Sequence, residues 1–363
     1  MNRLRPRSTT AARPCPSGPA AAWAQAAARF DLLGTLRASA FLGLALAVLL
    51  PSGSQAASDS RRGTLSLLLE NDLFYDTDRN YTNGVQAAWL TTPAQTPDWA
   101  VAAARAFVLF PSNSAVRISY AAGQNMYTPS DITLADPPQD DRPYAGWLYG
   151  SVGAIAETGR QLDQLELTLG VVGPASLAER TQKLVHRTIG ANRPNGWDSQ
   201  LKNEPGVVLT YQRSWRQFIA RPISEFRFDL TPHAGGALGN VFTYANAGVT
   251  FRFGRRLPLD YGPPRIQPSL PGSGFFIPRD GLGWYLFAGV EGRAVLRNIF
   301  LDGNSFRDSR RVDKNPLVGD VQFGFAATWD RFRLSYTHVV RSPEFKGQNV
   351  RDDFGAISLS VRF

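Results

Sequence analysis

The chain has 363 residues and a formal net charge of +9, from 39 Lys and Arg against 30 Asp and Glu. Six arginines and one aspartate fall in the first 56 residues, so the remainder carries only +4 and its charge does not indicate nucleic-acid binding. Cys15 is the single cysteine, which excludes a disulfide or a thiolate metal site from residues 57–363.

Residues 1–56 have the pattern of an export signal. An arginine-rich stretch precedes the apolar run 40–50, and small residues follow at Ser54, Ala56 and Ala57. The apolar run is too short for a permanent anchor, which needs about 20 residues. We expect 1–56 to be a signal peptide that is removed and 57–363 to be the exported domain.

Residues 70–84 collect acids, amides, hydroxyls and aromatic rings between two strand-like runs. Asp76, Asp78 and Asn80 fit ligand positions of an EF-hand loop, but Tyr81 replaces the required glycine and the closing glutamate is absent. The segment is therefore not an EF-hand, and composition alone favours a solvated acidic loop.

Alternation of apolar and polar residues recurs along the rest of the chain. It predicts twelve strands, many of them about ten residues long, which is the length that crosses a bilayer at a tilt. The predicted strands are 64–70, 82–91, 115–122, 144–156, 163–172, 206–215, 225–234, 244–253, 283–296, 318–329, 332–341 and 353–363.

The last predicted strand alternates most clearly and ends the chain on Phe363. Its apolar residues are Phe354, Ile357, Leu359, Val361 and Phe363, and its polar residues from 357 on are Ser358, Ser360 and Arg362. A soluble β-sandwich also alternates. The export signal, the absence of cysteine, the even strand number and the terminal phenylalanine favour an all-β, transmembrane antiparallel barrel in the bacterial outer membrane.

The connections give an orientation. Asp330–Arg331 forms a minimal turn, and with a periplasmic N-terminus the odd-numbered connections face outside. These are 71–81, 123–143, 173–205, 235–243, 297–317 and 342–352. The Pro- and Gly-rich connection 254–282 then lies on the periplasmic side, where it is longer than such turns usually are. Residues 98–110 predict either a short helix or an extra apolar turn.

One outer connection is predicted to contain a helix, at residues 177–189. Apolar residues recur there at helical spacing and Gly190 provides a stop. The residues on or near the apolar face are Leu177, Leu184, Val185, Thr188 and Ile189.

The chain contains three histidines, the side chain best matched to base chemistry at neutral pH. His338 lies within a predicted strand and His233 at the outer end of another. His186 lies on the predicted outer helix, at the same rim as the loop 71–81. A histidine on a helix is usually just a polar surface residue, but this shared rim favours His186 as the candidate base.

Several motifs occur in order along nearly the whole exported chain. They are Asn71–Asp72, YTNG at 81–84, GQNMYTPSD at 123–131, DRPYAGWL at 141–148, GVVGPAS at 170–176, HRTIGA at 186–191, GWDSQLKNE at 196–204 and SPEFKG at 342–347. Together they resemble the outer-membrane lipid A deacylases, which remove an acyloxyacyl chain from lipopolysaccharide. That family has a twelve-stranded barrel, in agreement with the strand count.

The resemblance implies a calcium-dependent carboxylic ester hydrolase of the lipid A 3'-O-deacylase type. His186 would accept a proton from the attacking water, and Asn71, Asp72 and Thr82 match the other site residues. Asp72 would ligate calcium, which polarises the ester carbonyl, and Asn71 would donate to the oxyanion. The implied partners are lipid A and outer-membrane lipid, and we expect a monomer.

One position departs from the family. Where a described member has glutamate six residues after the histidine, this chain has Asn192, an amide that can ligate calcium without adding charge. Asp198 and Glu204 are candidates to compensate. The residues expected to meet lipid A phosphates, each otherwise an ordinary surface charge, are Arg142, Lys183, Arg187 and Arg193.

Two other functions fit the same architecture. An outer-membrane phospholipase resembles a Ser–His–Asn enzyme with a His-x-Ser motif, and none of the three histidines is followed by serine at that spacing. A non-catalytic channel or adhesin would explain the barrel without using His186 at all. The non-catalytic alternative would be favoured if His186 pointed away from the Asn71–Thr82 segment.

Overall fold

The structure is a computed structural model that describes residues 63–72, 80–262, 265–266 and 274–363. The predicted signal peptide, residues 1–56, and the loop acids Asp76 and Asp78 lie outside the described residues.

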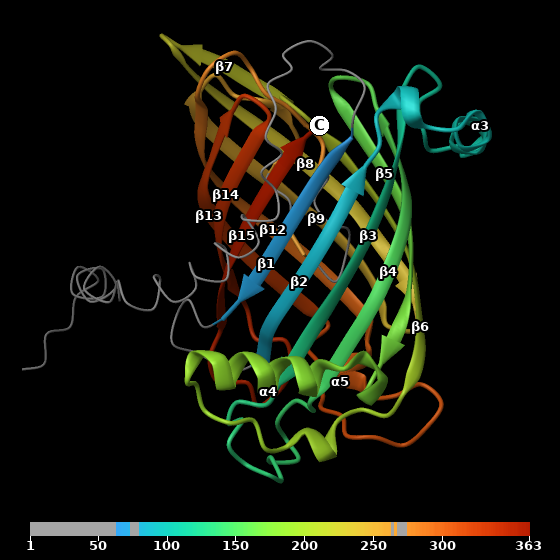
Figure 1. Ribbon diagram of the computed structural model, residues 1–363, viewed down its shortest axis with the longest axis vertical. Coiled ribbons are helices and arrows are strands. Elements are labelled where there is room, and N and C mark those ends of the chain that lie inside the picture. The colour runs from blue at the N-terminus through green and yellow to red at the C-terminus, as the bar shows by residue number, and fades with distance from the viewer. Residues whose placement is uncertain (1–62, 73–79, 263–264, 267–273) are drawn as a thin grey trace, which may run out of the picture. The chain divides into compact units, whose positions relative to one another are not determined.

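Twelve strands in the described part of the chain form one closed antiparallel ring (Figure 1). β15 pairs with β1, and β6 pairs with β8, so the sheet closes into a barrel. The ring strands are β1 (Thr64–Asn71), β2 (Asn80–Leu90), β3 (Ala115–Thr128), β4 (Ala145–Glu157), β5 (Gln161–Val172), β6 (Glu204–Trp215), β8 (Phe226–Gly239), β9 (Phe242–Arg255), β12 (Gly283–Asn298), β13 (Leu317–Trp329), β14 (Phe332–Arg341) and β15 (Asp352–Arg362). The predicted barrel and its strand number are confirmed.

The seam between the two ends of the chain is fully paired. Thr64 lies opposite Arg362 in the register of β1 and β15. The Phe363 N–H donates to the Gly63 carbonyl at 3.0 Å, and the Phe363 ring lies 6.1 Å from that of Trp89. The terminal phenylalanine therefore belongs to the barrel wall.

Each strand turns apolar residues outward and polar residues into the lumen. On β12, Leu286 and Val290 are exposed, whereas Glu291 and Arg293, which follow them with the opposite strand parity, are buried. This is the alternation by which the strands are recognised in the sequence. No helix in the described residues is long and apolar enough to cross a membrane.

The long connection 254–282 folds back against lumen-facing residues. It contains the two-residue strands β10 (Leu259–Asp260) and β11 (Phe276–Ile277), which pair with each other. Asp260 is fully buried and pairs with the guanidinium groups of Arg252 and Arg333. The described part of this long connection thus contributes side chains such as Asp260 to the lumen.

Near the other end, the lumen is filled by a cluster of aromatic and aliphatic side chains. Tyr127 stacks on Phe300 with ring centroids 4.0 Å apart, and Trp147 packs against Phe242 at 5.7 Å. The described residues therefore pack the barrel interior near both of its ends.

Some predicted boundaries were wrong. β3 continues to Thr128 and β8 to Gly239, so the connections predicted at 123–143 and 235–243 are shorter. His233 consequently lies within β8 and not at its outer end. An additional strand, β7 (Ile219–Ile223), follows β6 and pairs with β8.

Within the residues that the structure describes, three α-helices and three short 3-10 turns accompany the barrel. They are α3 (Asp98–Ala106), α4 (Ala178–Ile189), α5 (Ile299–Asp302), η2 (Pro93–Gln95), η3 (Pro174–Ser176) and η4 (Trp197–Ser199). The helix predicted at 177–189 is confirmed as α4, and of the two alternatives left open for 98–110 the structure has the short helix, α3. Figure 1 shows α4 across one end of the barrel, the outer rim of the predicted orientation, and α3 outside the wall at the opposite end.

Candidate functional site

The Asn71, Asp72 and Thr82 triplet lies at the outer rim, where β1 ends and β2 begins. Asn71 pairs with Asn83 in the strand register. The Asp72 N–H donates to the Thr82 carbonyl at 3.3 Å, and both residues are buried. The β1–β2 hairpin therefore brings the three predicted residues together.

Thr82 sits at an irregularity in the pairing of β2 with β3. The register shifts between Tyr81 and Asn83, as at a β-bulge, which re-aims a side chain. The Thr82 hydroxyl lies 2.6 Å from the hydroxyl of Thr128, at the end of β3. Thr128 was not predicted as a site residue, although it stands inside the motif at 123–131.

Helix α4 packs its small and polar stripe against the barrel. Ala178, Gln182 and His186, spaced four residues apart, are buried. A Cβ on Gly146 of β4 would collide with the Ala178 methyl group, so the helix approaches this strand closely. Gln182 accepts a hydrogen bond from the Trp197 indole N–H at 2.7 Å. The helix is thus fixed by a close backbone approach and by polar contacts.

The apolar stripe of the helix does not face the protein. Leu177 and Leu184 are both exposed. Because the surroundings of a membrane protein include lipid, an apolar helix face need not pack on the barrel. The predicted helix is confirmed, and its buried residues are Ala178, Gln182 and His186, none of which belongs to the apolar face recognised in the sequence.

The length of α4 relates His186 to the triplet. Gly146, Met126, Asn83 and Asn71 are paired in one row across β4, β3, β2 and β1. His186 is eight residues beyond Ala178, or about 12 Å along a helix. Strands about 4.8 Å apart put β2 and β1 roughly 10–14 Å from β4. α4 contacts β3 and β4, and Figure 1 shows it running towards the side of β1.

His186 is held through one ring nitrogen. Its Nδ1 lies 2.5 Å from the backbone carbonyl of Asn192. A carbonyl only accepts, so Nδ1 carries the proton in the neutral ring and Nε2 keeps its lone pair. Gly190 allows this return of the chain, since it ends α4 at φ 73° and the Ala191 N–H then donates to the His186 carbonyl.

The other two histidines contact carboxylates elsewhere. His233 Nε2 lies 2.9 Å from Glu291 Oε2 in the lumen. His338 Nε2 lies 3.4 Å from Asp353 Oδ1 on β15. His338 shares a pairing row with Asn71 through Gly355, so it too lies near the outer rim. Among the three histidines, His186 is the one on the α4 connection.

Arg142 does not lie where a surface phosphate contact requires. It is fully buried, with Nη1 3.3 Å from Glu344 Oε2 and its guanidinium 5.0 Å above the Tyr127 ring. Burial alone would raise the pKa of Glu344, but the guanidinium groups of Arg341 and Arg142 hold that pKa below its ordinary value. The pair instead joins the β3–β4 connection to the β14–β15 connection.

The other predicted cations lie on the α4 connection. Lys183 is partly exposed and pairs with Glu179 one helical turn earlier, at 2.5 Å. Arg187 and Arg193 are exposed. Both arginines remain available to an anionic ligand at the rim.

The donor types at the rim suit a hard cation only in part. The described residues contain no cluster of three or more His, Cys, Asp and Glu side chains that could hold a metal ion. Asp72 is a buried carboxylate beside hydroxyl and carbonyl oxygens, whereas the Asn192 side chain is exposed. Glu204 accepts from Asn240 and Ser305 and so has a structural role.

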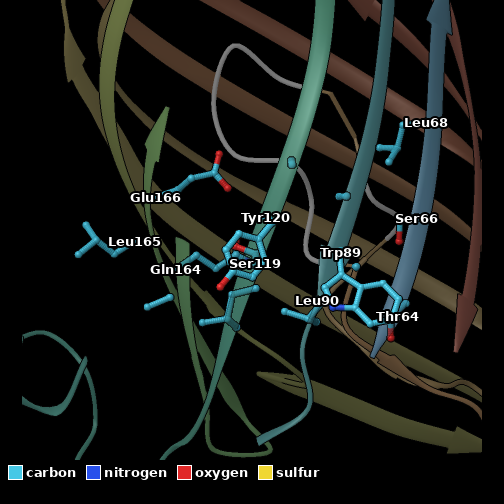
Figure 2. A pocket seen from close by; sticks show the side chains of 15 residues that line it. Thr64, Ser66, Leu68, Trp89, Leu90, Ser119, Tyr120, Gln164, Leu165 and Glu166 are labelled. Atoms are coloured by element: carbon cyan, nitrogen blue, oxygen red, sulfur yellow. The ribbon is translucent and has the colours of Figure 1, made fainter. Parts of the chain in front are cut away.

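Two cavities differ in size and position. One of about 280 Å³ lies at the outer rim between the β3–β4 and β14–β15 connections, bordered by Asp140, Asp141 and Gln348. The other, shown in Figure 2, lies along β1, β2, β3 and β5 near Ser66 and Glu166. Its volume of about 20 Å³ has room for about one water molecule. Only the rim cavity approaches ligand size.

The comparisons with known proteins agree with the geometry of the barrel. The solved structure of LpxR from Salmonella typhimurium has 21% sequence identity and a TM-score of 0.67, covering 83% of this chain and 100% of that one. The β domain of the Bordetella autotransporter BrkA has 10% identity and a TM-score of 0.42, covering 84% and 99%. No curated protein matches the sequence.

A family model described as outer membrane protein LpxR matches residues 41–363, which include every described strand. The likeness to the Salmonella structure shows the same fold. The chain therefore belongs to the LpxR family of outer-membrane proteins, the lipid A deacylase family that its motifs resemble.

Proposed function

We propose that this protein is a lipid A deacylase that hydrolyses an ester-linked acyloxyacyl chain of lipopolysaccharide at the outer rim of its barrel. The contact between His186 Nδ1 and the Asn192 carbonyl carries this proposal. It gives the neutral ring the tautomer that a general base requires, on the one buried polar stripe of α4.

In the proposed reaction, His186 Nε2 takes a proton from a water molecule as the water oxygen bonds to the ester carbonyl carbon. The resulting imidazolium is stabilised by the Asn192 carbonyl that accepts from Nδ1–H. When the tetrahedral intermediate collapses, the bond between the former carbonyl carbon and the alkoxy oxygen of the ester breaks. His186 Nε2 then gives its proton to that oxygen. The products are the acyloxyacyl chain as a carboxylic acid and the free hydroxyl of lipid A, so atoms and protons balance.

Asn71 is the proposed hydrogen-bond donor to the developing oxyanion. Its place beside Asp72 and Thr82 on the β1–β2 hairpin gives the donor a rigid support. The Thr82–Thr128 hydroxyl contact ties this hairpin to β3, against which α4 packs. One connected set of contacts thus supports both the base and the donor.

We propose calcium as the cofactor, with Asp72 as the carboxylate ligand and Asn192 as an amide ligand. Bound calcium would polarise the ester carbonyl. Because Asn192 adds no charge, we expect weaker binding than with glutamate at this position. Asn192→Glu should tighten calcium binding measured by titration calorimetry, and Asn192→Ala should keep the His186 contact, which uses the main chain.

Arg187, Arg193 and Lys183 are the proposed phosphate contacts, since lipid A is anionic and these cations surround the exposed face of α4. Leu184, the neighbour of Lys183 on α4, is exposed and offers an apolar surface to an acyl chain. A non-catalytic barrel would need neither set of contacts, whereas a phospholipid also carries a phosphate and acyl chains, so these contacts alone do not separate the two lipid substrates.

The test is mass spectrometry of lipid A and of phospholipids after incubation with the purified barrel, in calcium or in chelator. We expect loss of one acyloxyacyl mass only with calcium, and none with His186→Ala. Loss of acyl chains from phospholipids alone would establish the phospholipase alternative. Unchanged lipids of both kinds would rule out the enzyme and leave the non-catalytic barrel.

A further inference from the structure

The segment Asp98–Phe110, which contains α3, lies against the outside of the barrel wall. Ala104 and Phe110 pack with Val116 of β3 and Ala156 of β4. Val116 has the same strand parity as the exposed Tyr120, and Ala156 the same parity as the exposed Val152. The segment therefore covers wall positions that lipid would otherwise contact.

A polar cluster fixes this segment in place. The Asp163 carboxylate of β5 is fully buried and accepts from the Tyr211 hydroxyl and from Arg213 Nε, each at 2.6 Å. Arg213 Nη2 donates to the Leu109 carbonyl at 2.5 Å. The Phe107 ring packs edge-on against Tyr211, with centroids 6.0 Å apart. The segment is therefore attached to the outer wall by both apolar and charged contacts.

The opposite face of the segment is apolar and exposed. Trp99 is 74% exposed, Val108 89% and Leu109 43%. Between Trp99 and Leu109 the only charged residue is Arg105. A contiguous apolar surface of this kind marks a contact with another molecule or with a membrane.

The surrounding wall indicates which contact it is. At the same end of the barrel, aromatic rings pair on the outer face of neighbouring strands, Trp329 with Phe332 at 5.6 Å and Phe226 with Trp284 at 6.0 Å. Trp89 pairs there with the terminal Phe363. Aromatic girdles of this kind lie at the level of the lipid headgroups.

We propose that the segment Asp98–Phe110 is interfacial and inserts Trp99 of α3, together with Val108 and Leu109 after the helix, into the headgroup–acyl boundary of the membrane leaflet at this end. In the predicted orientation this is the periplasmic leaflet, and the contacting molecules are phospholipids. The continuity of the exposed face with the aromatic girdle and the apolar wall argues for lipid as the occupant. A short helix with one apolar face is suited to lie in the plane of the interface.

The test uses the absence of cysteine from residues 57–363, which makes every introduced thiol unique. Trp99→Cys and Val108→Cys carry an environment-sensitive fluorophore, with the folded barrel in phosphatidylcholine vesicles. Val290→Cys, on the outer face of the wall, is the reference for a label surrounded by lipid. Asp330→Cys, in a two-residue turn, is the reference for a label in water. Heat-modifiable electrophoresis confirms that each variant is folded. Quenching is measured with lipids nitroxide-labelled near the headgroup or deep in the acyl chain, and with iodide in water.

We expect the labels at positions 99 and 108 to be quenched most by the shallow nitroxide lipid and at least severalfold less by iodide than the label at 330. Equal iodide quenching at 99, 108 and 330 would overturn the proposal. Iodide accessibility in vesicles, combined with protection in native membranes, would also overturn it and assign the surface to a protein partner. Neither outcome depends on deacylase activity.

Discussion

The two helices outside the barrel lumen, α4 at the outer rim and α3 at the opposite end, use opposite chemistry to contact the barrel. α4 buries His186 and Gln182 and exposes Leu184, whereas α3 buries alanines and exposes Trp99. The helix face that contacts the barrel is polar in α4 and apolar in α3. In a membrane protein, the buried face of a helix reflects the specific partner and not hydrophobicity alone.

The largest expected effect is on deacylation, from replacing His186 on the buried face of α4. Replacement by alanine removes the proposed base, and we expect deacylation to fall by about 10²–10⁴-fold because general base catalysis contributes that much. The barrel should still assemble, since the twelve ring strands pair with one another through their main chains.

The control for this variant is His233→Ala, which removes a lumen histidine of the same chemistry. Initial rates of fatty-acid release measure both variants. Comparable loss in the two would mean that histidine loss acts through the fold and not through the rim.

The rim also depends on the buried pair of Arg142 and Glu344. Arg142→Met leaves Glu344 without one of its guanidinium partners, and we expect it to destabilise the barrel by about 3–5 kcal/mol. Denaturant unfolding in vesicles measures the free energy. The double variant Arg142→Met with Glu344→Gln should recover part of the loss, because no carboxylate then remains uncompensated.

Acid should weaken the same contact more mildly. The pKa of Glu344 is held below its ordinary 4.5, so the pair contributes its full stability above that pH and loses it as the pH falls through the lower, folded-state value. Melting temperature as a function of pH measures this. Glu344→Gln should lack the acid-dependent fall, and a parallel fall in the variant would assign it to another group.

Close packing of α4 is tested by Gly146→Ala. The added methyl would collide with Ala178 and with Ser176, and overpacking of this kind costs about 1–3 kcal/mol. We expect α4 to shift and deacylation to fall, while the barrel remains folded. Gly150→Ala on the same strand is the matched control, since its nearest neighbour is 3.8 Å away. Equal deacylation by the two alanine variants would show that the rate does not depend on the position of α4.

The smallest expected effect is at Gly190, which ends α4 in the left-handed region. A Cβ there meets nothing within 4 Å, so alanine adds only conformational strain of about 1–2 kcal/mol. Hydrogen exchange of the last turn of α4 should increase, with no change in α3. Unaltered exchange in α4 would mean that the turn to Asn192 does not need glycine.

The barrel was predictable because one repeated rule specifies every strand. Alternation along β12 or β15 records the two environments of the wall in the sequence itself, and the connections follow from it. Boundaries such as Thr128 were missed because the last residues of β3 face the packed rim, where both sides of the strand are buried and alternation stops.

The rim was predictable only through motifs. The hairpin of Asn71 and Thr82 follows from adjacent strands, but the partnership of Arg142 with Glu344 joins residues 202 positions apart, so local pattern carries no sign of it. Both residues stand in motifs that mark the family, which was the available signal. The burial of His186 could not be predicted from the sequence of α4, because apolar residues are ordinarily the ones a helix buries. The polar surroundings that favour its burial come from the end of the barrel, which is distant in sequence.

The pairing of Phe363 with Gly63 has a consequence for biogenesis. Because β15 pairs with β1, the ring closes only when the last strand in chain order meets the first described one. A chain that lacks β15 leaves β1 with an unpaired edge, and such an edge in a bilayer exposes unsatisfied backbone groups. Closure of the wall therefore depends on strands almost 300 residues apart, so pairing of neighbouring strands alone cannot complete it.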